Sequence, residues 1–368
     1  MPFPPVAGAL SIAPPIPIYR AGLGRSVPRG SIRVGPVSAL PDVLAGFGIE
    51  AEPIFRSFGI SAQILDDPDN TLPFSVLCKL ISKCVEVTGR DDFGLIVCER
   101  AGASNLGLVG FLLQQAPDVR SALGDLVRYL HHNDRGAVPF LKISNGVVGL
   151  GYAIHEPDVA ATDQIYDGAL AVCRNIMLAL CGPKWAPLEV VMSRPRPAGW
   201  TRYEKFFGSP VRFDAEQSAI FFAESWLDTI VPRADPALRR LLQEQIDHLE
   251  MEESGNLSEQ VRRLLRLALL TSSGSIDHVS RHLRTTKRTL CRRLSAEGTT
   301  FKILSEEVHF DVARHLLANT GMTITDISLA LSYSEASAFT RAFRKWSGVT
   351  PRAWRLSKAR RSTARSPL

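Results

Sequence analysis

Apolar residues recur at helical spacing along much of this chain, and the clearest pattern lies between residues 324 and 355. An apolar face predicts a short first helix, formed by Ile324, Ile327 and Leu331. Thr323 and Asp326 can cap that helix, and Ser334 can cap a second one after a break in the period. The second helix has an aromatic stripe and an opposite polar face, made by Phe339, Phe343 and Trp346 and by Ser337, Thr340, Arg341 and Arg344. Two short helices joined by a tight turn predict a helix-turn-helix unit.

The same pattern occurs a second time, upstream. The apolar positions of the first helix recur 48 residues earlier, at Ile276, Val279 and Leu283. Positions of the second helix recur 49 residues earlier, at Leu290, Arg292 and Leu294. Between the copies, helical spacing predicts one long amphipathic helix, through Phe301, Leu304, Val308, Val312 and Leu316. Because both units can pack against that helix, the repeat predicts a single domain with two helix-turn-helix units on a shared linker helix.

The first 250 residues mix helical and alternating patterns. Helical spacing predicts helices at about residues 40–47, 53–58, 73–87, 107–115, 119–131, 160–180, 200–207 and 235–252. Strand-like runs occur at residues 138–144, 147–155, 188–192 and 219–222. Asn145-Gly146, between the first two runs, is a strong hairpin signal. We therefore expect an α+β domain and not a regular series of β-α-β units.

Breaks in these patterns divide the chain into five segments. We expect residues 1–36, which are rich in Pro and Arg, to be a disordered leader or an over-long start of translation. Residues 37–252 form the expected α+β domain, and the Glu-Ser-Gly-Asn sequence at 253–256 is the expected hinge. An all-α domain with both helix-turn-helix units follows at residues 257–356. Residues 357–368 form a basic tail.

The charge of the chain divides at the same place. Residues 256–368 contain 20 Lys or Arg and 8 Asp or Glu, a net charge of +12, within a total of +6. Residues 1–255 contain 23 and 29 such residues, a net charge of −6. A basic domain beside a mildly acidic one fits nucleic-acid binding by the basic half, although charge alone would equally fit a membrane surface.

Few residues suggest catalysis, a cofactor or a metal. His131, His132, Asp134 and His155 could be combined into a metal cluster, but adjacent histidines are not expected to face one way on a helix or strand, so we predict no metal. Nucleophile-elbow, P-loop and dinucleotide motifs are absent from the sequence, which predicts no cofactor. No run of about 18 apolar residues indicates a membrane span. The scattered cysteines are expected to be reduced, mostly buried thiols, at Cys78, Cys84, Cys98, Cys173, Cys181 and Cys291.

Residues 256–356 resemble the DNA-binding domain of AraC-type transcription regulators. The resemblance is carried by the run from Ile324 to Arg355 and by the first-unit run from Leu283 to Phe301. Departures from the residues common in the family occur at Ser280, Arg284, Ser328 and Ser332. The resemblance implies a sequence-specific regulator that binds double-stranded promoter DNA and acts with RNA polymerase. Tandem units would enter the same face of the duplex one helical turn, about 34 Å, apart.

In this resemblance the second helix of each unit is the recognition helix. The positions expected to contact bases are Lys287, Arg288, Cys291, Arg292, Ala336, Ser337, Thr340 and Arg341. An arginine near the start of such a helix can bind guanine with two hydrogen bonds, which is worth roughly 1 to 3 kcal/mol of discrimination. The positions expected to neutralise phosphates are Arg344, Lys345, Arg352 and Arg355. The alternative is that these charges are simply solvated on an exposed face.

Residues 37–250 resemble, more loosely, the effector-sensing half of the ornithine-utilisation regulator subgroup. The matching segments include 93–95, 106–110, 128–129 and 203–213. This resemblance implies a small-molecule effector, by analogy polar and of the amino-acid or amine type. Pairing of two chains through this half is a further expectation.

These features together predict a transcription regulator, cytoplasmic and nucleoid-associated, that activates transcription in response to its effector. The alternative is an enzyme that uses the DNA-binding domain to reach its substrate, such as a DNA-repair methyl acceptor. Such an enzyme needs an exposed, activated cysteine. Most of the cysteines lie in apolar patterns, so we predict that the chain is not an enzyme.

Overall fold

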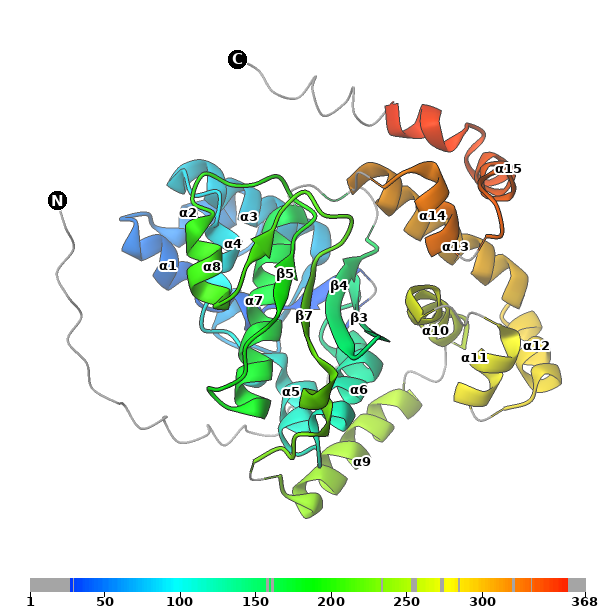
Figure 1. The fold of residues 1–368 in the computed structure, drawn as a ribbon, viewed down its shortest axis with the longest axis horizontal. Helices are drawn as coiled ribbons and strands as arrows, with labels where there is room; N and C mark the ends of the chain where they lie inside the picture. The colour runs from blue at the N-terminus through cyan, green and yellow to red at the C-terminus, as the bar shows by residue number, and fades with distance from the viewer. Residues whose placement is uncertain are drawn as a thin grey trace.

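The fold is that of a computed structural model, which describes residues 27–28, 30–156, 159, 162–232, 234–252, 257–271, 275–283, 285–319, 322–331 and 333–356. A domain of helices and strands comes first in the chain and an all-helical domain follows it, as the colours of Figure 1 show. The predicted fold class is therefore confirmed. The expected hinge at residues 253–256 and the expected tail at 357–368 lie outside the described residues.

The N-terminal domain is built on a five-stranded sheet with the strand order β3-β4-β7-β5-β6. The strands are β3 (Ala137–Ser144), β4 (Val147–Ile154), β5 (Glu189–Val191), β6 (Val211–Arg212) and β7 (Ala219–Ala223). The predicted hairpin is confirmed, because Asn145 and Gly146 join β3 to β4 with φ angles of 52° and 77°, as a type I′ turn requires. The sequence did not predict β6, which pairs in parallel with β5. The other neighbouring strands are antiparallel, so the α+β expectation holds.

Nine α-helices are described in this domain. They are α1 (Leu40–Gly46), α2 (Ala51–Arg56), α3 (Phe74–Thr88), α4 (Phe93–Cys98), α5 (Gly107–Gln114), α6 (Val119–Tyr129), α7 (Thr162–Cys181), α8 (Thr201–Phe207) and α9 (Pro236–Glu252). Only α4 was not predicted, because six mostly apolar residues show no period. The longest helix, α7, packs on β4 and on α3 and α4, and it buries Leu170, Ile176, Met177 and Leu180 in the main core.

The prediction of a leader over residues 1–36 fails at its C-terminal end, where the structure describes a strand. Residues Ser31–Arg33 form β1, which pairs with β2 (Thr71–Pro73), and Ile32 and Val34 are buried. Arg33 is also buried, and its guanidinium donates to the carbonyl of His132 at 2.9 Å and to the carboxylate of Asp69 at 2.5 Å. The assignment of residues 31–36 to a disordered leader is wrong, because the strand that pairs with them lies far along the chain and leaves no local signal.

The last helix of the domain, α9, has its own small core with α5 and α6. Leu242, Ile246 and Leu249 are buried there, against Leu108, Val109, Leu112 and Tyr129. Arg239 of α9 also forms an ion pair of 2.7 Å with Asp125 of α6. These contacts hold α9 against the rest of the N-terminal domain.

The C-terminal domain contains six further helices whose bounds are given: α10 (Leu257–Thr271), α11 (Ile276–His282), α12 (Lys287–Ala296), α13 (Phe301–Asn319), α14 (Ile324–Ala330) and α15 (Ala336–Ser347). Residues 351–356 are helical as well. The long helix α13 lies between the two helix-turn-helix units (Figure 1), and its Leu304, Val308 and Leu317 are buried in the core that both units share. The predicted shared linker helix is confirmed. No helix in the described ranges is long and apolar enough to cross a membrane.

Candidate DNA interface and interdomain contact

The first helix-turn-helix unit consists of α11 and α12. Ser275 caps α11, and Thr286 caps α12 by accepting a hydrogen bond from the backbone N–H of Thr289. Val279, Leu290 and Leu294 are buried, which fixes the inner faces of the two helices. The outer face of α12 is exposed at all four predicted positions, Lys287, Arg288, Cys291 and Arg292.

The second unit consists of α14 and α15, and it is held by an aromatic cluster. The predicted capping box at Thr323 and Asp326 is present at the start of α14. Phe339 and Phe343 are fully buried, and the Phe343 ring lies 5.5 Å from Phe310 of α13 and 5.9 Å from Trp354. The prediction that Ser334 caps α15 is wrong. Glu335 occupies the N-cap position, and its side chain forms no capping hydrogen bond.

The predicted base-reading positions of α15 differ in their exposure. Ser337 and Arg341 are exposed, whereas Ala336 and Thr340 are half-buried. Arg341 donates to the Ser337 hydroxyl at 3.3 Å and lies 3.5 Å from the Glu335 carboxylate. Exposed contacts of this kind are worth at most about 1 kcal/mol, so a stronger acceptor on DNA can replace them.

The four predicted phosphate positions are not equivalent. Arg344 and Arg352 are exposed, and the Lys345 ammonium lies 3.0 Å from the Glu306 carboxylate of α13. Arg355 is half-buried, and it donates to the carbonyls of Leu317 at 3.2 Å and Met322 at 2.6 Å. Arg355 therefore fixes the last helical segment to the end of α13. A phosphate contact by Arg355 stays a prediction.

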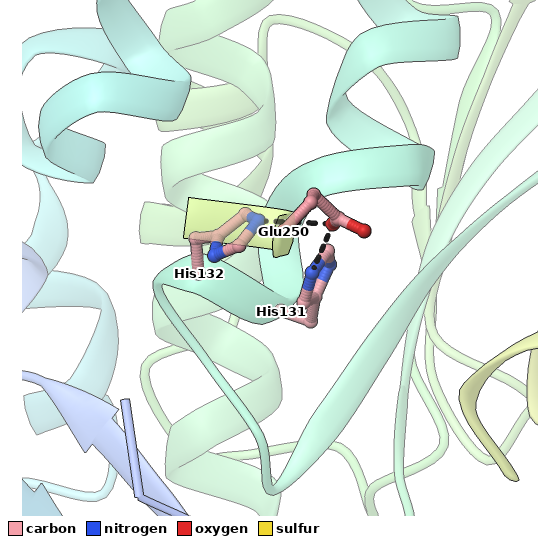
Figure 2. Close-up of side chains that lie close together, drawn as sticks. All are labelled: His131, His132 and Glu250. Carbon is pink, nitrogen blue, oxygen red and sulfur yellow. Dashed lines mark hydrogen bonds and ion pairs between the residues drawn. The ribbon is translucent and has the colours of Figure 1, made fainter. Parts of the chain in front are cut away.

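The two domains meet at a polar cluster that sequence patterns did not predict, and Figure 2 shows three of its side chains, His131, His132 and Glu250. His131 and His132 lie after α6, and their Nε2 atoms are 2.8 Å and 3.1 Å from the same carboxylate oxygen of Glu250, in α9. Arg263 of α10, in the DNA-binding domain, donates to that oxygen at 3.1 Å and also contacts His131 Nε2. Local signals could not reveal this cluster, because Arg263 is 132 residues from His131.

This cluster corrects one expectation about the histidines. The expectation that they point apart is wrong, because the turn Leu130–His132 is a 3₁₀ helix in which both side chains reach Glu250. They do so without Asp134 or His155, the partners considered from sequence. Burial raises the pKa of Glu250, but hydrogen bonds from the two histidines and the charge of Arg263 outweigh that effect and hold the pKa far below its ordinary value.

Charge at the cluster is therefore balanced without a metal ion. Burial, and next the charge of Arg263, keep the pKa of His131 well below its ordinary value, so this imidazole is neutral at pH 7. Its Nδ1 lies 3.1 Å from the carbonyl of Arg128, and its Nε2 is the atom that contacts both the Glu250 carboxylate and the Arg263 guanidinium. Three side chains here could ligate a metal, but the Arg263 guanidinium already supplies the positive charge that Glu250 needs.

The cysteines of the N-terminal domain do not suit nucleophilic chemistry. Burial raises the pKa of five thiols to about 12, at Cys78, Cys84, Cys98, Cys173 and Cys181. Thiols with such pKa values hold almost no thiolate at pH 7. Only Cys291 is exposed among the cysteines, and it lies on the outer face of α12.

Comparisons with known proteins agree with this architecture. Residues 48–231 match the family model described as the arabinose-binding N-terminal domain of AraC transcription regulators, and residues 279–357 match a helix-turn-helix domain model. The ornithine utilization regulator of Pseudomonas aeruginosa is 26% identical over 326 residues, which cover 88% of this chain and 96% of that protein. The HTH-type transcriptional regulator VirS of Mycobacterium tuberculosis is 27% identical over 329 residues, with coverage of 88% and 96%.

A solved structure is also similar. The transcriptional regulator CdpR from Pseudomonas aeruginosa shares 23% identity, with a TM-score of 0.41, and the match covers 83% of this chain and 96% of CdpR. The two family models match parts of both domains, and the two relatives are named as a utilization regulator and an HTH-type transcriptional regulator. This chain belongs to the AraC-type transcription regulators, with an N-terminal ligand-binding domain and a C-terminal helix-turn-helix domain that binds DNA.

Proposed function

We propose that this chain is an effector-responsive activator that reads one asymmetric promoter site with α12 and α15, each in one of two successive major-groove segments. The observation that carries the proposal is the pair of packed units on α13, each of which exposes arginine on its recognition helix. Since both units share one core, the two helices reach DNA as a single body. Their separation should match one helical turn of about 34 Å.

The base contacts that we propose differ between the two helices. On α12 the strongest candidates are Arg288 and Arg292, which can bind guanine with two hydrogen bonds each. Cys291 and Lys287 lie on the same exposed face, and Lys287 forms an ion pair of 2.7 Å with Asp277 that DNA would replace. On α15, Arg341 is the strongest candidate. Ala336, Ser337 and Thr340 would contact thymine methyl groups or phosphates.

Phosphate contacts are proposed mainly for Arg344, Lys345 and Arg352, which are exposed. Arg355 already satisfies two backbone carbonyls, so its main role is to position the end of the domain. The basic residues of 357–368 would add non-specific attraction to DNA. Residues 253–256 would act as the hinge between the domains.

Several partners are proposed from the similar proteins. Relatives named as transcriptional activators include NphR of Rhodococcus and VirF of Shigella flexneri, which supports activation through RNA polymerase. Pairing of two chains through the N-terminal domain and a cytoplasmic, nucleoid-associated location follow from the same resemblance. A polar, ornithine-like effector is suggested by the name of one relative.

The test is DNA binding by the full chain. A mobility-shift titration with the intergenic DNA upstream of the gene, at two salt concentrations, would compare the wild type with an Arg288→Ala, Arg341→Ala double variant. Loss of two bidentate contacts should cost about 2 to 6 kcal/mol of preference over competitor DNA. Arg212→Ala is the matched control, because Arg212 is exposed in the N-terminal domain and pairs only with Glu189 in the described contacts.

The variants separate the outcomes. If the control binds like the wild type and the double variant binds without preference, the assignment of recognition helices holds. If the double variant keeps full preference for the upstream DNA, the base-reading residues lie elsewhere and the proposal is refuted.

A further inference from the structure

The N-terminal domain contains a cavity between α3, α4, α6, α7 and β4. The space open to the centres of water-sized molecules is about 90 Å³, well above the roughly 10 to 15 Å³ that one water needs on this measure. Its wall is almost entirely apolar and includes Leu77, Ile81, Val97, Leu126, Val172 and Ile176. Such a wall favours an apolar occupant over water.

Most polar groups at this wall already have partners. The Asp134 carboxylate accepts hydrogen bonds from the Gly136 N–H at 2.7 Å and from the Tyr152 hydroxyl. The Gln164 amide accepts from the Gly94 N–H at 2.8 Å and donates to the carbonyl of Asp91 at 2.7 Å. The hydrogen-bonding groups of Asp134 and Gln164 are therefore engaged with protein partners and shape the cavity.

Asn133 is the exception. The residue is 2% exposed and is among those that line the cavity, and its Nδ2 is buried without a hydrogen-bond partner in the part of the chain that the structure describes. A buried amide donor without an acceptor is destabilising, so such groups in native proteins normally meet one. The missing acceptor is most simply supplied by a molecule inside the cavity.

The wall also argues against a charged amino acid as the occupant. None of the described residues that line the cavity is Lys, Arg or His, so a ligand carboxylate would lack a cationic partner. Asp134 is the one acidic group at the wall, and burial raises its pKa to about 7. A ligand ammonium would have to compete with Tyr152 and Gly136 for it.

We propose that this cavity is the effector site, and that its ligand is a small, uncharged, mainly apolar molecule with one hydrogen-bond acceptor, such as a ketone or ester oxygen, which Asn133 binds. The proposal rests on the proposed function of the chain as an effector-responsive regulator. It differs from the polar, amino-acid type of effector that resemblance to the ornithine-utilisation subgroup suggests.

The same turn that lines the cavity also touches the DNA-binding domain. Leu130, Asn133 and Asp134 face the cavity, whereas His131 and His132, between them in the chain, contact Glu250 and Arg263. A ligand that pulls on Asn133 therefore displaces a five-residue turn whose other side chains hold α10. Occupancy of the cavity would change the orientation of the DNA-binding domain through this turn.

The first experiment measures binding of matched small probes to the full chain, by calorimetry and thermal shift. The probes are acetophenone, a straight-chain ketone (2-heptanone), ethylbenzene, which has the shape of acetophenone without its acceptor, 1-phenylethylamine and L-ornithine. We expect at least one ketone to bind and to raise the melting temperature, and ethylbenzene to bind about tenfold more weakly than acetophenone, for one lost hydrogen bond. Tighter binding of 1-phenylethylamine or L-ornithine, or no binding of either ketone, would overturn the proposal.

Two variants locate the site. Asn133→Leu keeps the volume and removes the unpaired donor, so the unliganded variant should melt at a higher temperature and should no longer prefer acetophenone to ethylbenzene. Ala169→Phe fills the cavity from α7 and should abolish binding of both. If Asn133→Leu still prefers acetophenone by the wild-type factor, Asn133 does not bind the acceptor, and the proposal fails.

A third variant tests the connection to DNA binding. Arg263→Met should bind the tighter ketone as well as the wild type does, but that ketone should no longer change its affinity for the upstream DNA. If the ketone binds and wild-type DNA affinity never changes, the role of the turn is refuted. If the wild type shows no preference for the upstream DNA even without a probe, the proposed DNA-binding function fails. That outcome does not depend on whether the probes bind the cavity, so the two proposals can fail independently.

Discussion

Breaking the ion pair between Arg263 and Glu250, which joins the two domains, should lower the free energy of unfolding by a measurable amount. The side chains of Arg263 and Glu250 are 16% and 27% exposed, so the pair is neither fully buried nor at the surface. Removing one partner of a buried pair costs about 3 to 5 kcal/mol, and an exposed pair contributes at most about 1 kcal/mol. For the intermediate burial seen here we expect Arg263→Met to lower the free energy of unfolding by about 1 to 3 kcal/mol. Part of this cost arises because Glu250 keeps its negative charge but loses its cationic partner.

A double-mutant cycle isolates this interaction. The free energy of unfolding would be measured by urea denaturation for Arg263→Met, Glu250→Gln and the combined variant, and we expect a coupling energy of about 1 to 2 kcal/mol. Arg262→Met is the matched control, because Arg262 is the adjacent residue of α10, also 16% exposed, and pairs with Glu259 and Glu307 inside its own domain. A coupling energy below about 0.3 kcal/mol between Arg263 and Glu250 would refute this account of the contact. The account would also be refuted if the coupling energy between Arg262 and Glu250 equalled that between Arg263 and Glu250.

Acid should weaken the same contact. Because the folded pKa of His131 is depressed below the ordinary value of 6.5, the unfolded chain binds a proton more readily than the folded one. The depressed pKa of Glu250 acts in the same direction at lower pH, below its ordinary value of 4.5. The contribution of the cluster to stability is therefore present above about pH 6.5 and is lost as the pH falls. The free energy of unfolding should therefore fall between pH 7.5 and pH 5, and an unchanged value would contradict the depressed pKa of His131.

Other perturbations test the remaining parts of the molecule. Arg344→Ala should reduce the slope of log affinity against log salt by about one, without changing sequence preference, in mobility shifts at several salt concentrations. Phe343→Ala should cost about 3 to 5 kcal/mol in urea denaturation, since Phe343 is fully buried. The raised pKa of Asp134, about 7, means that its contribution to stability is greatest below about pH 4 and is lost as the pH rises through 7. Asp134→Asn should therefore flatten the fall in melting temperature between pH 4 and pH 7.

Local sequence signals were sufficient for the DNA-binding domain. Its helices follow a 3.6-residue period, and the Thr286 and Thr323 caps lie within three residues of the groups they bind. The repeat then doubles the evidence for each unit. The N-cap of α15 is the one wrong detail. Ser334 and Glu335 are adjacent, and either could end the turn. The packing of Phe339 against Tyr333 helps to set which of them does so.

The N-terminal domain was less predictable where pairing is distant. β1 pairs with a strand about forty residues later, and β6 has only two residues; neither shows a period that a sequence window can detect. The same holds for the candidate effector site. Asn133 has an ordinary neighbourhood in the sequence, and only the folded arrangement of α3, α6 and α7 shows that this residue lines an apolar cavity.

The shared helix α13 sets how strictly a promoter must be spaced. Both units bury their inner faces against α13, and Phe310 of that helix contacts Phe343 and Trp346 of the second unit. One inserted base pair would rotate the second half-site by about 35° and shift it by about 3.4 Å along the duplex. A chain whose two recognition helices share a core cannot follow that rotation without losing core contacts. The phase between the two half-sites should therefore be as strongly selected in its promoters as the bases themselves.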